Sequence, residues 1–187
     1  MNLMFKFILF ISIGLPLKSA ALCSTADSSD RDKSSLIIYG DGFSFAVKEP
    51  FGWKADCENA EKLGSNVIFY RKNESLKNTK TLIRIRLNGK TDENIAADLE
   101  HDVNGYKQTF KDSVKFSDLE IVHPKYKLVS KLFFIPDNFF EYVVYLNPGQ
   151  KSRFVFSFSM NKQKQKATPD EIETFKIICG SILLIRD

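Results

Sequence analysis

Strict alternation of apolar and polar positions is the strongest pattern in this chain, and such alternation predicts β-strands. In residues 43–47, Phe43, Phe45 and Val47 alternate with smaller or charged residues. A Gly-Asp-Gly turn at residues 40–42 joins them to the apolar run at residues 36–39. The two runs therefore predict a β-hairpin.

The same period of two recurs along the rest of the chain. It predicts strands at residues 67–72, 81–88, 115–122, 125–134, 140–146 and 154–160. Tight turns at residues 136–138 and 147–150 join the last three strands, which predicts an antiparallel meander. The last strand is expected to point four side chains inward: Phe154, Phe156, Phe158 and Met160.

Two segments show helical spacing instead. Residues 91–111 predict an amphipathic helix of about five turns, with a stripe made of Ile95, Leu99, Val103, Tyr106 and Phe110. A second helix is expected to begin at Thr168, because Pro169 and Glu171 follow it in the pattern of a capping box. Its stripe contains Ile172, Phe175, Ile178, Cys179 and Ile182. An antiparallel sheet with helices packed on it is an α+β domain, and these two helices are expected to cover opposite faces.

The first 21 residues have the features of a signal peptide for export. Lys6 precedes an apolar run at residues 7–17, which is too short to cross a bilayer but fits the hydrophobic region of a signal peptide. Ser19 and Ala21 supply the small residues of a cleavage site, so we expect cleavage after Ala21 and export to the periplasm or the medium. Residues 22–34 predict a flexible segment, residues 35–187 predict one domain, and no transmembrane segment is expected.

The net charge gives no support to a nucleic-acid partner. The chain has 187 residues with 27 Lys and Arg against 23 Asp and Glu, a formal charge of +4. Residues 1–21 contain Lys6 and Lys18 and no acid, so removing them leaves 25 basic and 23 acidic residues, or +2. A charge this small on an exported chain excludes nucleic-acid binding as the leading hypothesis.

Three cysteines remain after the expected cleavage. Export permits disulfides, and the odd number leaves one cysteine over. Cys57 could pair with Cys179, which would tie a loop to the last helix, or with Cys23, which would tie down the N-terminal segment. The sequence leaves both pairings open. Cys23 also raises the alternative of a lipid-anchored protein, which Leu22 before it disfavours.

A cluster of basic residues is the most distinctive local feature. Arg84 and Arg86 share one face of a predicted strand, and Lys125 and Lys127 share a face of another. If these strands are neighbours, they form a cationic surface suited to an anionic partner or to lipid headgroups. The candidate residues are Arg71, Lys72, Arg84, Arg86, Lys125 and Lys127. We favour the simpler explanation that basic residues protect a sheet surface from aggregation.

No pattern in the sequence indicates catalysis. There is no Gly-x-Ser-x-Gly elbow, no glycine-rich phosphate loop and no Cys-x-x-Cys pair. His101 is expected on the exposed side of the first helix and His123 in a turn. We therefore predict no catalytic residue, no cofactor and no metal site.

Two short motifs resemble those of the PsbP-like superfamily. Residues 42–47 (GFSFAV) and 50–53 (PFGW) are similar to its opening hairpin and turn. The final helix of the family is similar at Phe175, Ile178, Ser181 and Ile182. The resemblance implies an α/β/α sandwich around an antiparallel sheet. No residue with a functional role is carried over, because the sequence has no His or carboxylate motif that matches the metal-linked role of the photosynthetic members.

These observations lead to one functional hypothesis and its rivals. We expect an exported, non-enzymatic binding or assembly module, whose partner is an unknown protein or an anionic surface in the cell envelope. The alternatives are a secreted enzyme or inhibitor with a site assembled from scattered polar residues, and a lipid-anchored envelope factor.

Overall fold

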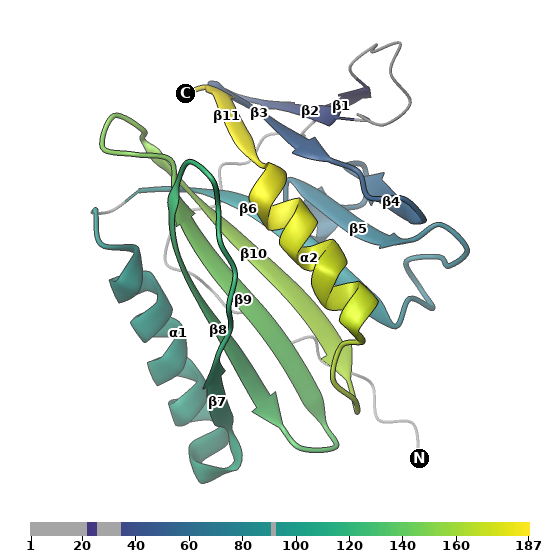
Figure 1. The fold of residues 1–187 in the computed structure, drawn as a ribbon, viewed down its shortest axis with the longest axis vertical. Helices are drawn as coiled ribbons and strands as arrows, with labels where there is room; N and C mark the ends of the chain where they lie inside the picture. The colour runs from purple at the N-terminus through teal and green to yellow at the C-terminus, as the bar shows by residue number, and fades with distance from the viewer. Residues whose placement is uncertain (1–21, 26–34, 91–92) are drawn as a thin grey trace.

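The computed structural model describes residues 22–25, 35–90 and 93–187 (Figure 1). The helices are α1 (Ile95–Phe110) and α2 (Pro169–Ser181), with short 3-10 turns η1 (Glu61–Leu63) and η2 (Lys111–Ser113). The strands are β1 (Leu22–Thr25), β2 (Ser35–Gly40), β3 (Phe43–Lys48), β4 (Trp53–Asp56), β5 (Val67–Arg71), β6 (Thr81–Gly89), β7 (Lys115–Asp118), β8 (Lys127–Ile135), β9 (Phe139–Asn147), β10 (Phe154–Gln163) and β11 (Leu183–Arg186).

The strands form two antiparallel sheets. The larger has seven strands in the order β4-β5-β6-β10-β9-β8-β7, and the smaller has four in the order β1-β2-β3-β11. In the larger sheet, β10 lies between β6 and β9, and it pairs antiparallel with both. The last strand of the chain, β11, pairs with β3 near its beginning, so the smaller sheet joins the two ends of the described chain.

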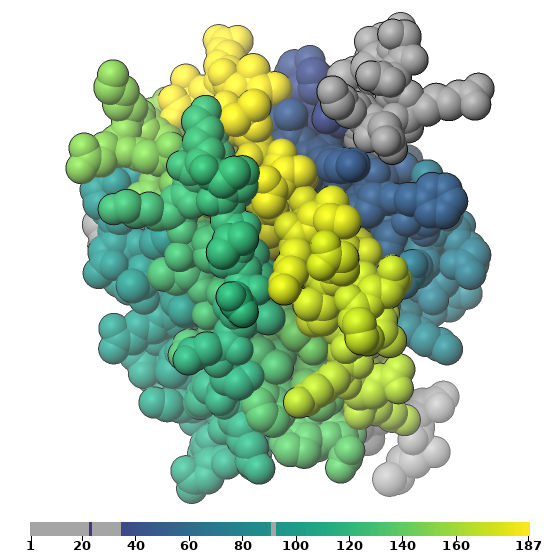
Figure 2. Space-filling view, in the orientation of Figure 1, coloured from purple at the N-terminus to yellow at the C-terminus, as the bar shows by residue number. Residues whose placement is uncertain are grey.

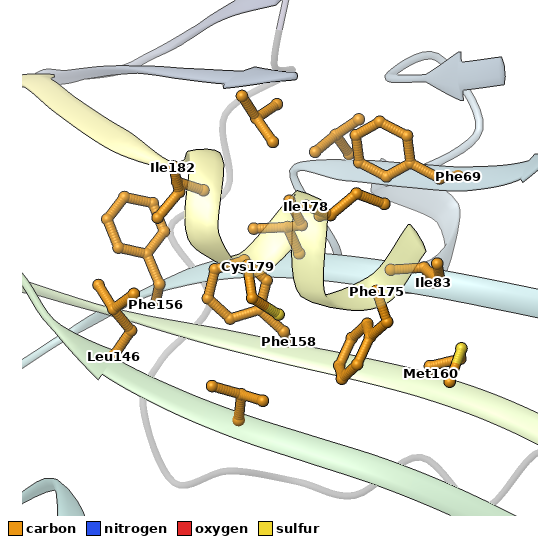
Figure 3. Close-up of a cluster of buried hydrophobic side chains, with 14 of the residues drawn as sticks. Phe69, Ile83, Leu146, Phe156, Phe158, Met160, Phe175, Ile178, Cys179 and Ile182 are labelled. Atoms are coloured by element: carbon orange, nitrogen blue, oxygen red, sulfur yellow. The ribbon is translucent and has the colours of Figure 1, made fainter. Parts of the chain in front are cut away.

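The main core lies between the larger sheet, α2 and the smaller sheet (Figure 3). Side chains at alternate positions of β10 fill its centre, where Phe156 lies 5.2 Å, between ring centroids, from Phe45 of the smaller sheet. From α2, Phe175, Ile178 and Cys179 are fully buried against these rings. In the space-filling view α2 lies across the middle of this face of the molecule (Figure 2).

Local interactions fix the start of α2. The Thr168 side chain accepts from the Glu171 backbone N–H, and the Glu171 carboxylate accepts from the Thr168 N–H, which completes the predicted capping box. The same carboxylate accepts a hydrogen bond from Lys162 of β10 at 2.8 Å, and both side chains of this ion pair are buried. The helix start is therefore attached to the sheet as well as capped.

The opposite face of the larger sheet is covered by α1. Tyr106 of the helix stacks on Phe133 of β8, with 4.3 Å between the ring centroids. Ile95 and Leu99 complete the buried side of α1, together with Val143 and Val155 of the sheet. The alternate residues of β9 and β10 thus face two different cores.

The expected fold class is wrong. The α/β/α sandwich required helices as the covering layers of a single sheet, whereas the described residues form eleven strands and only two α-helices, and the strands divide into two sheets. The physical reason is that the chain does not end with α2. Residues after Ser181 extend into β11, which pairs with β3 and completes a second sheet beside the helix. The fold is therefore rich in β-structure.

Most individual elements agree with the sequence predictions. The hairpin β2–β3, the meander β8–β9–β10 and both helices are confirmed. The strand expected at residues 115–122 ends at Asp118, because the following segment leaves the sheet and His123 hydrogen-bonds to the Ile182 carbonyl, 3.0 Å away. The sequence patterns did not predict the short strands β1, β4 and β11.

The structure decides between the two cysteine pairings. Cys23 is bonded to Cys57, and Cys179 is a buried free thiol whose pKa burial raises well above its ordinary value. The pairing of Cys57 with Cys179 is therefore wrong, because the Cys179 side chain packs inside the core under α2. A sulfur atom held in a disulfide cannot also carry a thioether-linked lipid, which argues against the lipid-anchored alternative.

Some predictions for the N-terminal region lie outside the described residues. These are the signal peptide at residues 1–21, the cleavage after Ala21 and the flexible segment at residues 26–34. Residues 22–25 were expected to be flexible as well, but they form β1 and pair with β2. In the part of the chain that the structure describes, no helix is long and apolar enough to cross a membrane.

Replacing both Cys23 and Cys57 by serine is expected to lower the free energy of unfolding by about 4 kcal/mol. The bond joins residues 34 positions apart, and closing a loop of this length restricts the unfolded chain. Equilibrium denaturation in urea measures the difference. In the oxidised wild-type protein one thiol, that of Cys179, should react with a thiol reagent, and only after unfolding. Peptide mapping that links Cys57 to Cys179 would contradict this pairing.

Candidate functional site

The structure distributes the six basic candidates over separate parts of the molecule. Arg71 forms an ion pair with Asp170 of α2, and its guanidinium lies 4.7 Å from the centre of the Trp53 ring. Lys72 forms an ion pair with Glu49 at 2.9 Å. These two residues are thus engaged at the end of the sheet where α2 begins.

The two lysines lie elsewhere. Lys125 precedes β8 and stacks on Tyr126, with 5.5 Å from its Nζ atom to the ring centre, and Lys127 is exposed at the start of β8. Two strands, β9 and β10, separate β8 from β6, which carries the two central arginines. The six residues therefore do not form one cationic surface but lie in three separate pairs, and of these the pair Arg84 and Arg86 lines a cavity.

Arg84 and Arg86 project from β6 on the face that α1 covers, because the intervening Ile85 belongs to the main core. The strand register sets serines beside them: Ser159 of β10 is opposite Arg84, and Ser157 is opposite Arg86. Continuing to β9, Tyr145 is opposite Ser157. On the face toward α1, these positions of β6, β10 and β9 carry polar side chains. On the face toward α2, the neighbouring positions of β10 carry aromatic side chains.

A small cavity lies over this polar floor. Its volume is about 60 Å³, and its walls come from α1 on one side and from the segment after η1 on the other. We call it the Arg86 pocket, and its polar lining includes Ser65, Arg84, Arg86, Asp102, Ser157 and Ser159. A space of this size holds a few water molecules or one small ion, since a single water needs about 10–15 Å³.

Arg84 is fully engaged by its neighbours. Its Nε atom donates to Ser159 at 3.1 Å, one terminal nitrogen donates to the Asn161 side chain at 2.7 Å, and the same nitrogen lies 3.5 Å from a Glu141 carboxylate oxygen. The other oxygen of Glu141 accepts from the Tyr106 hydroxyl. Glu141 therefore neutralises Arg84 at the edge of the pocket.

Arg86 has no such partner. Its Nε atom donates to the Gly64 carbonyl at 2.5 Å, but within the described ranges no carboxylate lies at ion-pair distance from its guanidinium. Burial lowers the pKa of Arg86, and the positive charge of Arg84 adds to the effect. The negative charge of Asp102 across the pocket opposes this shift, but it does so without an ion-pair contact. Arginine stays protonated in proteins, so Arg86 brings a positive charge to the pocket.

Asp102 projects from the buried side of α1 into the same pocket. One of its oxygens accepts a hydrogen bond from the Tyr145 hydroxyl at 2.8 Å. Burial raises the pKa of Asp102 to about 6, with the hydrogen bond from Tyr145 opposing the shift and the charge of Glu141 adding to it. This carboxyl therefore changes its charge close to neutral pH, unlike an ordinary aspartate.

The two serines can still donate hydrogen bonds. Ser157 accepts from the Asn88 side chain at 3.0 Å and Ser159 accepts from Arg84 at 3.1 Å. Among the residues with described positions, no acceptor is found for either hydroxyl proton. Both hydroxyls can therefore donate to a ligand in the pocket.

The sequence prediction for this site found the two arginines and missed its other members. Ser157 and Ser159 alternate with the inward-facing Phe156 and Phe158, so their polarity on a buried strand was a usable signal. Asp102 was the second signal, because it lies between Leu99 and Tyr106 on the buried side of α1.

The two histidines lie away from this pocket. His101 is exposed on α1. The Nδ1 atom of His123 accepts from the backbone N–H groups of Lys125 and Tyr126, so Nε2 carries the proton and donates to Ile182. Over the described positions, no group of three His, Cys, Asp or Glu side chains could hold a metal ion.

No protein-family model matches this chain, and no curated protein matches it. The resemblance to the PsbP-like superfamily therefore stays a prediction from short motifs.

The variant Asp102→Asn is expected to gain stability relative to the wild type as the pH rises from 4 to 8. A raised pKa means that the folded state binds the proton more tightly than the unfolded state, whose Asp has its ordinary pKa of 3.8. The stability from this group is thus present below pH 4 and is lost as the pH rises through about 6. The full change corresponds to about 3 kcal/mol.

Urea denaturation at several pH values measures this difference between Asp102→Asn and the wild type. Glu100→Gln is the matched control, because Glu100 is exposed on the same helix. This control shows how much of any difference comes from removing a negative charge from α1 and not from Asp102 itself. An Asp102→Asn difference that is equal at pH 4 and pH 8 would show that Asp102 ionises as an ordinary aspartate.

Proposed function

We propose that this chain is an exported binding module without enzymatic activity, and that the Arg86 pocket is its ligand site for a small anion. The observation that supports this proposal is the Arg86 guanidinium, which is half-buried, faces a cavity and has no carboxylate partner in the described part of the chain. Asp102 acts on Arg86 only from beyond ion-pair distance, and a partly buried charge without a close counter-ion is costly. An anion bound from solution would provide the counter-ion.

The donors around the cavity fit an oxyanion. The Arg86 guanidinium can donate two parallel hydrogen bonds to a planar or tetrahedral oxyanion, and Ser157 and Ser159 add two hydroxyl donors from the floor. The volume of about 60 Å³ matches a small ion better than a sugar or a nucleotide. The sequence suggested an anionic surface as one possible partner. We propose in its place a small anion that binds in the Arg86 pocket.

The Cys23–Cys57 disulfide supports the export part of this proposal. Disulfides persist in oxidising compartments and are rare in the cytosol. The expected signal peptide at residues 1–21 points to the same compartment. The ligand would then be an anion present outside the cytoplasm.

A secreted enzyme is the second candidate function, and the pKa of about 6 at Asp102 favours it. A carboxyl with this pKa can act as a general acid or base near neutral pH, and Arg86 could stabilise negative charge in a transition state. Hydrolysis of p-nitrophenyl phosphate by the purified protein, lost in both Asp102→Asn and Arg86→Gln, would establish this candidate and overturn the non-enzymatic proposal.

The anion site is tested by titrating the protein with inorganic phosphate at constant ionic strength and following the backbone amide resonances of the residues that line the pocket by NMR. The wild type should show saturable binding. Arg86→Gln should weaken it at least about tenfold, because it removes a charge-assisted pair of hydrogen bonds.

Lys127→Gln is the matched control, since it makes the same change in net charge at an exposed position outside the pocket. Its affinity should equal that of the wild type. Binding that is equally strong in Arg86→Gln would place the anion elsewhere on the protein. The absence of saturable binding in the wild type would overturn the proposal.

A further inference from the structure

We infer that the Arg86 pocket selects an oxyanion that carries a proton, such as hydrogen phosphate, over a fully ionised oxyanion of the same shape and charge, such as sulfate. This inference rests on the proposed function and specifies its ligand class. It follows from the position of Asp102, a hydrogen-bond acceptor, inside a site whose other groups are donors.

The charges of the pocket leave one cation and one acid to face the ligand. Arg84 is neutralised by Glu141, whose second oxygen is held by Tyr106. Arg86 and Asp102 remain, and no ion pair joins them. A ligand in the cavity is therefore in contact with a guanidinium on one side and a carboxyl on the other.

The Asp102 carboxyl has one oxygen available to the ligand. Its Oδ2 atom accepts from Tyr145 at 2.8 Å, and no hydrogen bond to Oδ1 is found in the described segments. An oxyanion beside an ionised Oδ1 would bring two negatively charged oxygens together, which is strongly unfavourable. A proton between them converts this repulsion into a short, charge-assisted hydrogen bond.

The shared proton has two sources. Hydrogen phosphate brings its own proton and can donate it to ionised Asp102, while its other oxygens accept from Arg86, Ser157 and Ser159. Sulfate has no proton near neutral pH, so Asp102 must take one from solution before sulfate binds. Sulfate affinity should therefore depend on pH through Asp102, whereas phosphate affinity should depend on it far less.

Several titratable groups act on Asp102 and could contribute to any pH dependence. On α1 these are Asp98 and His101, and on β9 they are Glu141 and Tyr145. From β6, Arg86 approaches the same pocket. Because several groups are involved, pH alone cannot identify the residue responsible, and the test requires a substitution at Asp102.

The decisive experiment compares sodium phosphate and sodium sulfate as ligands of the full-length mature protein, by calorimetry and NMR at pH 7 and equal ionic strength. Hydrogen phosphate and sulfate have the same charge and shape and differ by one proton. We expect phosphate to bind about tenfold more tightly, because an acid with a pKa of about 6 is about one-tenth protonated at pH 7. At pH 5 the sulfate affinity should rise about tenfold.

Asp102→Asn provides the second test. The amide can still accept from Tyr145 and can donate to the ligand, so sulfate should bind to the variant at pH 7 about as tightly as it binds to the wild type at pH 5. Glu100→Gln, on the exposed side of the same helix, should keep the preference of the wild type. The pH 5 measurement on the wild type tests the inference independently if Asp102→Asn folds poorly.

The possible outcomes distinguish a failure of the selection by Asp102 from a failure of the anion site at Arg86. Equal affinities for sulfate and phosphate at pH 7 in the wild type would overturn the selection by Asp102 and leave the anion site in place. Binding of neither anion would overturn the anion site as well. A third titration with O-phosphoserine distinguishes the sources of the phosphate group: binding as tight as that of inorganic phosphate indicates a phosphomonoester, and much weaker binding indicates the free anion.

Discussion

The register in which β6, β10 and β9 pair is the constraint on which the rest of this structure depends. In this register Phe156 and Phe158 meet α2 and the smaller sheet, while Ser157 and Ser159 meet the arginines of β6. A shift of β10 by one residue would exchange the two faces, burying hydroxyls under α2 and aromatic rings against guanidinium groups. The strong contrast between the two faces makes such a shift very costly. The alternation of aromatic and polar side chains along β10 therefore determines both the packing of the main core and the position of the serines that line the pocket.

Polar side chains that are buried on a sheet need hydrogen-bond partners, and here a small number of side chains from β6, β9, β10 and α1 provide them for one another. Arg84, Glu141 and Asn161 satisfy one another, and Asp102 is held by Tyr145. These contacts join three strands to α1, so they orient the helix as well as the site. Arg86 is the exception in this network. Its guanidinium lies beside the cavity with no carboxylate at ion-pair distance in the described part of the chain, and this is the feature on which the proposed anion site rests.

The sequence predicted the elements better than their assembly. Period-two alternation in β3, β6 and β10 and the capping box of α2 are local signals, and both are confirmed. The second sheet was missed because β11 is a four-residue strand directly after a helix, and its pairing with β3 spans almost the whole chain. The pocket was only half predicted for the same reason. Arg84 and Arg86 share a strand and were recognised together, whereas Asp102 and Ser157 reach them only through tertiary contacts that no local spacing encodes.

The pairing of β11 with β3 also makes completion of the fold depend on contacts between residues far apart in the chain. Without residues 183–186 one edge of β3 has no partner and the smaller sheet is incomplete. A domain closed by contacts between its two ends has a high contact order and folds slowly. The smaller sheet therefore cannot be completed by local folding around the hairpin β2–β3 alone, but requires the strand that follows α2.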